Sequence, residues 1–237
     1  MISKIVTVGV RFAARVPWKA VYVVFAMFVL SLYLMFTVVN DRYMHHMPWY
    51  ERPAPCITPQ LIMDKLINLS FAVSDILTKL NVSHTLCYGT LWGALRHGTI
   101  LPWDNNVDFC VLKKEIQAVP WEKLKGHFLA ENINFYYDYR HGIYIINNGP
   151  AEVIINVFYI TPFGEVLQDG FENRFLWFFQ EQPLSFPLRL LEPPFKKIPF
   201  HNRQMPVPHE DIEILKYLYK HDWWLIKSPP GCSQGSK

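Results

Sequence analysis

The 237-residue sequence has few charged residues and no surplus of basic ones beyond its first 40 positions. Charged residues make up 18% of the chain, and residues 1–40 contain no Asp or Glu. Those residues hold Lys4, Arg11, Arg15 and Lys19, while the rest of the chain has 19 basic and 20 acidic residues. The formal net charge of +3 is therefore a basic tip on a near-neutral domain, which argues against nucleic acid as a partner. A hydrophobic content of 51% excludes a disordered chain, and the length fits one domain with an anchor.

Cysteine is also scarce, and no pair of cysteines has the Cys-x-x-Cys spacing of a zinc site. Cys56 and Cys232 flank the expected globular part. A disulfide between them would stabilise the folded domain by about 4–5 kcal/mol in the chain-entropy model. The competing interpretation is that both cysteines are unpaired near the chain ends. Cys87 and Cys110 lie within apolar runs, so we expect them to be small buried hydrophobic residues.

Residues 20–39 form an uncharged, strongly apolar run. An α-helix of about 20 residues spans the hydrocarbon core of a bilayer, whereas the apolar part of a cleaved signal peptide is usually about 7–15 residues long. Basic residues precede the run, and the positive-inside bias then makes residues 1–19 a cytosolic tip and residues 20–39 a type II transmembrane signal-anchor. Residues 40–57 become a short stem outside the cytosol. Two sequons, at Asn68 and Asn81, agree with that topology.

The periodicity of apolar residues predicts an α+β domain with a small sheet over residues 58–225, followed by a flexible tail at 226–237. Residues 58–80 have apolar positions at spacings of three and four, which is typical of an amphipathic helix. The Pro-rich residues 183–208 are expected to be ordered but irregular. The other expected helices are 91–96, 120–131 and 210–219, and the expected strands are 85–88, 107–112, 134–139, 143–146 and 152–160.

The residues between Cys87 and Cys110 suggest a site for a phosphate and a metal ion. A strand that ends in Gly89-Thr90 at the start of a helix offers backbone N–H groups to an anion, and glycine permits close approach. Asp104, Asn106 and Asp108 alternate at the start of the next strand, so they share one face. Carboxylates on one face suit Mg²⁺ or Mn²⁺ bridging nucleotide phosphates.

These residues resemble the LicD / fukutin / fukutin-related-protein family. The resemblance rests on YGTLWGALRHG at residues 88–98, on ILPWD at residues 100–104 and on Asp108. Three later segments resemble family segments and follow in the same order. They are VIINVF at residues 153–158, PVP at residues 206–208, and YLY at residues 217–219 followed by Asp222-Trp223. The similarity covers roughly residues 58–225.

The resemblance implies a nucleotidyltransferase-like fold, with a small mixed sheet flanked by helices after one N-terminal transmembrane helix. It also implies transfer of ribitol phosphate or phosphocholine from a CDP-linked donor to a glycan acceptor at the Golgi or ER membrane, with the domain lumenal and Mg²⁺ or Mn²⁺ as cofactor. Carried over to this sequence, the catalytic residues are Asp104 and Asp108, the metal positions are Asn106, Asp108 and Asn156, and the donor-phosphate residues are Gly89, Thr90, Arg96 and His97.

The sequence departs from the family pattern at the metal positions. Asn106 and Asn156 stand where the family usually has Asp, and an amide offers a cation one neutral oxygen and no charge. Glu152, four residues before Asn156 on the same strand face, is a candidate to compensate. Two hypotheses follow: an active phosphotransferase, or a weakened or inactive member that binds glycan or a partner glycosyltransferase. A third, a membrane adaptor without ligand, leaves the Gly-Thr and Asp pattern unexplained.

The topology makes a first prediction. The full-length chain expressed in mammalian cells should lose apparent mass on endoglycosidase treatment, because Asn68 or Asn81 would face the lumen. The Asn68→Gln/Asn81→Gln double variant is the control and should show no shift. Digestion of residues 40–237 by protease added from the cytosolic side would contradict the orientation.

Overall fold

The computed structural model describes residues 17–46, 55–175, 185–225 and 228–232. The chain divides into two compact units, Met1–Arg52 and Pro53–Lys237. In the first unit the described structure is one helix, α2 (Trp18–His46). Its segment Trp18–Val39 is the one helix in the described residues that is long and apolar enough to cross a membrane. The expected span at 20–39 lies within it. Residues 1–16 of the expected tip and residues 47–54 of the expected stem lie outside the described residues.

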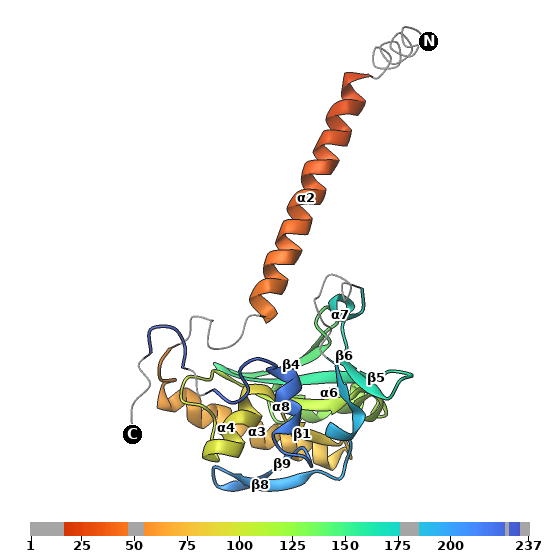
Figure 1. The fold of residues 1–237 in the computed structure, drawn as a ribbon. Coiled ribbons are helices and arrows are strands. Elements are labelled where there is room, and N and C mark those ends of the chain that lie inside the picture. Colours follow the sequence, from red (N-terminus) through yellow and green to blue (C-terminus); the bar gives the residue numbers. More distant parts are fainter. Residues whose placement is uncertain (1–16, 47–54, 176–184, 226–227, 233–237) are drawn as a thin grey trace. The chain divides into compact units, whose positions relative to one another are not determined.

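The second unit is built around a seven-stranded mixed sheet, shown in Figure 1. Strands β1-β2-β5-β4-β3 are hydrogen-bonded in that order, β6 pairs with β5, and β7 pairs with β6. Only the β2–β5 pair is parallel among these pairings. The sheet strands are β1 (His84–Leu86), β2 (Asn106–Leu112), β3 (Asn134–Asp138), β4 (Ile143–Asn148), β5 (Ala151–Ile160), β6 (Glu165–Gln168) and β7 (Ser185–Pro187).

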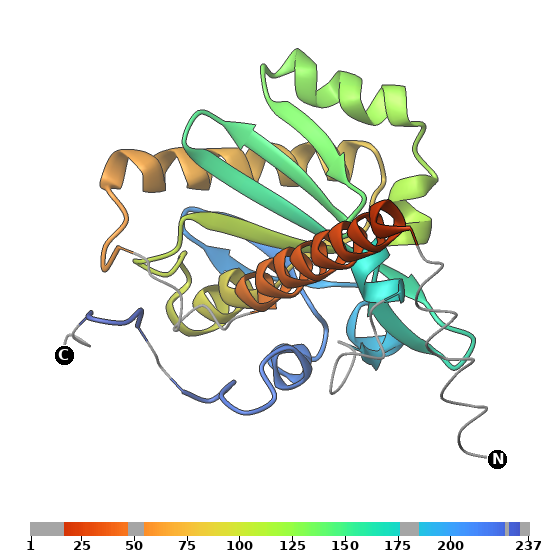
Figure 2. The same ribbon diagram turned by 90° about the horizontal axis from the view of Figure 1, so that it is seen from above.

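Helices cover both faces of this sheet. Figure 2 shows strand β2 lying between α3, in orange, and α4, in yellow. The helices of this unit are α3 (Gln60–Lys79), α4 (Tyr88–His97), α5 (Lys113–Gln117), α6 (Trp121–Ala130), α7 (Phe171–Phe175), α8 (Glu213–Leu218) and a 3₁₀ helix (Leu188–Leu190). A separate hairpin consists of β8 (Lys196–Phe200) and β9 (Arg203–Val207).

The central strand β5 explains how one sheet supports a core and a polar site. Successive side chains of a strand point to opposite faces. On one face, Val153, Ile155 and Val157 are buried with the apolar side of α3. The other face carries Asn156, together with Asp108 from the parallel neighbour β2, whose Cα lies opposite that of Ile154. The hydrophobic core thus fixes the strands that present the polar residues.

Most predicted elements are confirmed to within a few residues, but residues 183–208 are not irregular. They contain β7, the 3₁₀ helix and the β8–β9 hairpin. Proline normally argues against a strand because it cannot donate a ladder hydrogen bond. Pro199 and Pro206 are accommodated because each strand of a two-stranded sheet has a free edge. Helix α5 and strand β6 were also not predicted, because both are too short to show a period.

All four cysteines form disulfides in the structure. Cys56 pairs with Cys232, with their Cα atoms 5.3 Å apart, which joins the start of the domain to the tail. The rest of the tail, residues 226–227 and 233–237, lies outside the described residues. Cys87 and Cys110 are buried, as expected from their apolar runs, and they pair with each other, a connectivity that the sequence left open. Their Cα atoms are 5.5 Å apart because β1 pairs antiparallel with β2 immediately before Cys87.

Both sequon asparagines are exposed. Asn68 lies within α3, and the hydroxyl of its partner Ser70 donates to the carbonyl of Ile67. Asn81 lies in the turn after α3 with a φ of 55°. The second sequon is therefore the more accessible of the two in the folded domain.

The cross-links make a second prediction. Peptide mapping without reduction should recover a Cys56–Cys232 peptide pair and a Cys87–Cys110 pair. The two loops, of 176 and 23 residues, correspond to about 5 and about 3 kcal/mol in the chain-entropy model. The Cys56→Ser/Cys232→Ser variant should therefore lose at least as much stability as Cys87→Ser/Cys110→Ser in urea unfolding. Recovery of any of the four as a free thiol in the native protein would contradict the pairing.

Candidate functional site

The candidate site lies where α4 begins beside β2. The backbone N–H of Cys87 donates to the carbonyl of Asp108 over 2.9 Å, and the N–H of Asp108 donates to Oγ1 of Thr90, also over 2.9 Å. The Cys87–Cys110 disulfide adds a covalent link between the same segments. Tyr88 turns the chain from strand to helix with a φ of 50°, which is uncommon for a bulky residue. The surrounding bonds hold this turn in place.

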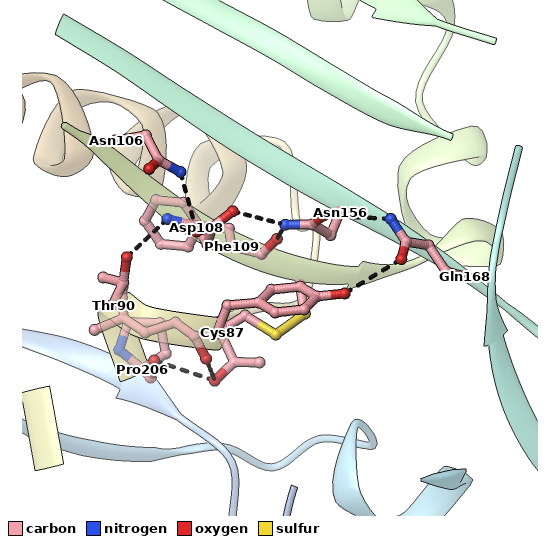
Figure 3. Close-up of a disulfide and its surroundings, with 12 residues drawn as sticks. Cys87, Thr90, Asn106, Asp108, Phe109, Asn156, Gln168 and Pro206 are labelled. Carbon is pink, nitrogen blue, oxygen red and sulfur yellow. Dashed lines mark hydrogen bonds between the residues drawn. A yellow bond between two sulfur atoms is a disulfide. The ribbon is translucent and has the colours of Figure 1, made fainter. Parts of the chain in front are cut away.

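Asp108 is held by two asparagine side chains, as Figure 3 shows. Nδ2 of Asn106 donates to Oδ2 of Asp108, and Nδ2 of Asn156 donates to Oδ1, each over 3.0 Å. Nδ2 of Asn156 also lies 3.3 Å from the carbonyl oxygen of Phe109. A carbonyl and a carboxylate only accept hydrogen bonds, so the amide of Asn156 must turn its N–H groups toward Asp108.

The hydrogen bonds continue from Asn156 across the sheet face. Nε2 of Gln168 lies 3.5 Å from Oδ1 of Asn156, and the hydroxyl of Tyr88 donates to Oε1 of Gln168 over 3.2 Å. Burial, followed by the charge of Asp108, raises the pKa of Tyr88, so this hydroxyl stays a donor. The sequence analysis did not identify Tyr88 or Gln168 as site residues. Tyr88 stood inside the motif that carried the resemblance, whereas Gln168 ends a strand that was not predicted.

Asp104 lies close to the first turn of α4. Oδ2 of Asp104 would be 3.5 Å from a Cβ placed on Gly89, and its backbone carbonyl accepts from Oγ1 of Thr58 over 2.8 Å. Burial, followed by the charge of Asp108, raises the pKa of Asp104 to about 8. At neutral pH Asp104 is therefore mostly protonated, and Asp108 carries the negative charge of the site.

The residues present do not fit the divalent cation that the family resemblance implies. The amides of Asn106 and Asn156 direct N–H groups toward Asp108, and an N–H group cannot bind a cation. Mg²⁺ and Mn²⁺ prefer carboxylate oxygens, whereas Asn106 and Asn156 supply amides at two of the three expected metal positions. No group of three His, Cys, Asp or Glu that could hold a metal occurs in the described part of the chain.

Glu152 lies at the start of β5, and its Cα is opposite that of Asn106 in the β2–β5 pairing. It shares a strand face with Asn156, but four residues of strand separate the two by about 13 Å. Burial raises the pKa of Glu152, which disfavours an added charge at this end of the site. The position of Glu152 therefore differs from that of the missing carboxylate.

Arg96 and His97 lie at the other end of α4. The guanidinium of Arg96 lies 3.9 Å from the centre of the Trp92 ring and donates to the carbonyl oxygens of Trp223, over 3.0 Å, and Trp224. The His97 ring lies 6.0 Å from that of Trp92. About 9 Å of helix separates Thr90 from Arg96. Of the expected donor-phosphate residues, the structure thus brings Thr90 to Asp108 and Gly89 to Asp104, while Arg96 binds the C-terminal segment.

Comparison with known proteins identifies the class of the domain. Residues 81–210 match the LicD/FKTN/FKRP nucleotidyltransferase domain, so the chain belongs to the LicD family. An uncharacterised protein of Rickettsia typhi is 28% identical over 153 residues, which are 61% of this chain and 42% of the bacterial protein. The chain thus spans about two fifths of the length of that relative.

Two solved adenylyltransferases show a distant likeness. ANT(2″)-Ia in complex with adenylyl-2″-tobramycin has a TM-score of 0.36 at 9% identity, over 61% of this chain and 70% of the other. The lincosamide antibiotic adenylyltransferase LnuA, lincomycin-bound, has a TM-score of 0.38 at 12% identity, over 62% of this chain and 83% of the other. The family assignment rests on the sequence match, and it defines a phosphotransferase-type nucleotidyltransferase domain.

The raised pKa of Asp104 makes a third prediction. The folded state retains a proton that the unfolded chain releases near pH 4, so the contribution of Asp104 to stability should fall as the pH rises from about 4 to about 8. Asp104→Asn is neutral throughout. Its melting temperature should exceed that of the wild type more at about pH 8.5 than at about pH 5. Asp64→Asn, an exposed substitution on α3, is the control, and a pH-independent difference for Asp104→Asn would contradict the prediction.

Proposed function

We propose that this chain is a type II membrane protein of the Golgi or ER whose lumenal LicD-type domain binds a glycan and has weakened or lost metal-dependent phosphoryl transfer. The observation that carries the proposal is the double hydrogen bond from Asn106 and Asn156 to Asp108. In-line phosphoryl transfer depends on cations that neutralise the developing charge. Amide N–H groups occupy the carboxylate oxygens that such a cation would use.

Two further observations support the membrane topology and compartment. Helix α2 contains an apolar segment of sufficient length, and the Lys and Arg residues that precede it have no acidic counterpart. The two disulfides fit an oxidising lumen, since disulfides are rare in the cytosol. A domain that binds a glycan without catalysing its modification would act together with a partner glycosyltransferase.

A second candidate is an active transferase that moves ribitol phosphate or phosphocholine from a CDP-linked donor to a glycan. The start of α4 favours it, because Gly89 lies beside Asp104 and the first turn of a helix attracts phosphate. In that case the backbone of α4 would bind the donor phosphates, and Asp108 would remain the charged group nearest to them. Release of CMP from a CDP-linked donor distinguishes this candidate from the first.

Restoring the two carboxylates makes a fourth prediction. Without metal, Asn106→Asp/Asn156→Asp should melt below the wild type, because three carboxylates then crowd one face. With Mn²⁺ at about 100 times its Kd, mass action should stabilise the double variant by about 2.7 kcal/mol. The wild type should show no comparable gain. Asn134→Asp/Asn148→Asp adds the same charge at exposed positions of β3 and β4 and is the matched control.

Calorimetry with CDP, with and without Mn²⁺, accompanies the melting curves. CDP should bind the double variant more tightly when Mn²⁺ is present, since the metal bridges carboxylates and phosphates. Equal Mn²⁺-dependent CDP binding by the wild type, together with CMP release, would overturn the proposal in favour of the active transferase. A double variant that ignores Mn²⁺ would mean that these positions do not converge on one metal position.

A further inference from the structure

A cavity of about 110 Å³ lies on the face of the sheet opposite Asp108. Val157 and Asp169 line it, and each directly follows a residue of the Asp108 network, Asn156 or Gln168. Neighbouring residues of a strand point to opposite faces, so the sheet separates the cavity from that network. Lys113, Trp121, Tyr137, Tyr139 and Tyr144 also line it.

Aromatic rings from α6, β3 and β4 form much of the cavity wall. The Trp121 ring stacks on that of Tyr144 with centroids 6.3 Å apart, and the Tyr137 ring contacts those of Tyr144 and Tyr139 with centroids 4.5 and 4.7 Å apart. Tyr139 is 78% exposed and Trp121 is 41% exposed, so both rings reach solvent at the cavity. Large exposed rings beside a concave site are typical of ligand binding rather than of core packing.

The charges inside the cavity are paired. Oδ2 of Asp169 accepts from Nζ of Lys113 over 2.7 Å and from the hydroxyl of Tyr137 over 3.1 Å, while Oδ1 accepts from Arg174. Burial opposes ionisation of Asp169, but these partners hold its pKa below the ordinary value. Burial also raises the pKa of Tyr144 to about 12, so its hydroxyl remains protonated. An ammonium and three tyrosine hydroxyls therefore stand at the cavity as hydrogen-bonding groups.

This combination selects one chemical class of ligand. Lys113 and Asp169 are paired with each other over 2.7 Å, so a charged ligand would have to compete with that ion pair. A neutral polyhydroxylated ring would place its C–H face on the aromatic rings and its hydroxyl groups on the paired charges. The cavity is smaller than the usual site for a drug-sized molecule, so it admits one terminal residue and leaves the remainder outside, beside Tyr139.

We propose that the cavity of Trp121, Tyr137, Tyr139 and Tyr144 is a second glycan-binding site, which takes a neutral terminal sugar residue on the sheet face opposite Asp108. The choice of a glycan rests on the proposed function, whereas the position and neutrality of the site rest on the cavity. The site would hold a glycan chain to the domain independently of the Asp108 network.

The test uses the full-length protein in nanodiscs, because glycoside detergents would present sugars of their own. The probe is an array of neutral oligosaccharides, each printed with and without terminal sialic acid. The wild type should bind neutral members, and Tyr139→Ala should weaken that binding about tenfold or more, since aromatic anchors dominate such contacts. Tyr139→Phe should stay within about threefold, because it keeps the ring. Tyr136→Ala removes an exposed ring from β3, three residues before Tyr139 and outside the cavity, and is the matched control.

The outcomes separate this proposal from the proposed function. Equal loss with Tyr136→Ala, or binding confined to sialylated members, would overturn the cavity as a neutral-sugar site. Neutral-glycan binding that survives Tyr139→Ala but is lost in Asp108→Asn would assign the glycan to the other face, and the proposed function would stand without this site. Absence of glycan binding in the wild type would contradict both.

Discussion

The carboxylate of Asp108 is half-buried, so its negative charge must be stabilised by hydrogen bonds. The arrangement of the other site residues depends on these hydrogen bonds. Hydrogen bonds to a charged group contribute about 1.5–3 kcal/mol, and leaving such a group unsatisfied costs more. Asn106 and Asn156 provide two N–H donors from two parallel strands. The same contacts orient the amide of Asn156 toward Asp108 and leave its oxygen for Gln168. The charge of Asp108 therefore orients the amides of Asn106 and Asn156 directly, and that of Gln168 through Asn156.

The backbone of Asp108 is equally constrained, because the start of α4 is fixed to it. The Thr90 hydroxyl accepts the N–H of Asp108, and Cys87 is joined to β2 by a hydrogen bond and a disulfide. The Thr90 hydroxyl thus serves the β2 backbone as an acceptor. An anion at this helix start would be bound by backbone N–H groups and the helix dipole.

The sequence was sufficient to predict which residues share a strand face, but not what each side chain does there. Alternation alone predicted that Asn106 and Asp108 would face the same way. The orientation of the Asn156 amide depends on the carbonyl of Phe109 in the neighbouring strand, and that register is a tertiary feature. The disulfide between Cys87 and Cys110 could not be predicted from the sequence, because it depends on the antiparallel pairing of β1 with β2. The aromatic cavity was not predicted because its rings, from the successive elements α6, β3 and β4, meet Lys113, Val157 and Asp169 only in the folded sheet.

A cluster of three carboxylates is destabilised by like-charge repulsion unless a cation lies between them, so the stability of such a site is coupled to metal binding. Asparagine at two of the three positions removes the repulsion and adds the donors that Asp108 requires. The domain then retains its sheet, its helix start and its network without depending on a metal for charge balance. Strand β5 remains free to present Val157 on its other face, beside the aromatic cavity. Under the proposed function, a change of the metal positions at one face leaves the second face intact, so the domain keeps its shape for binding even where its transfer chemistry is weakened.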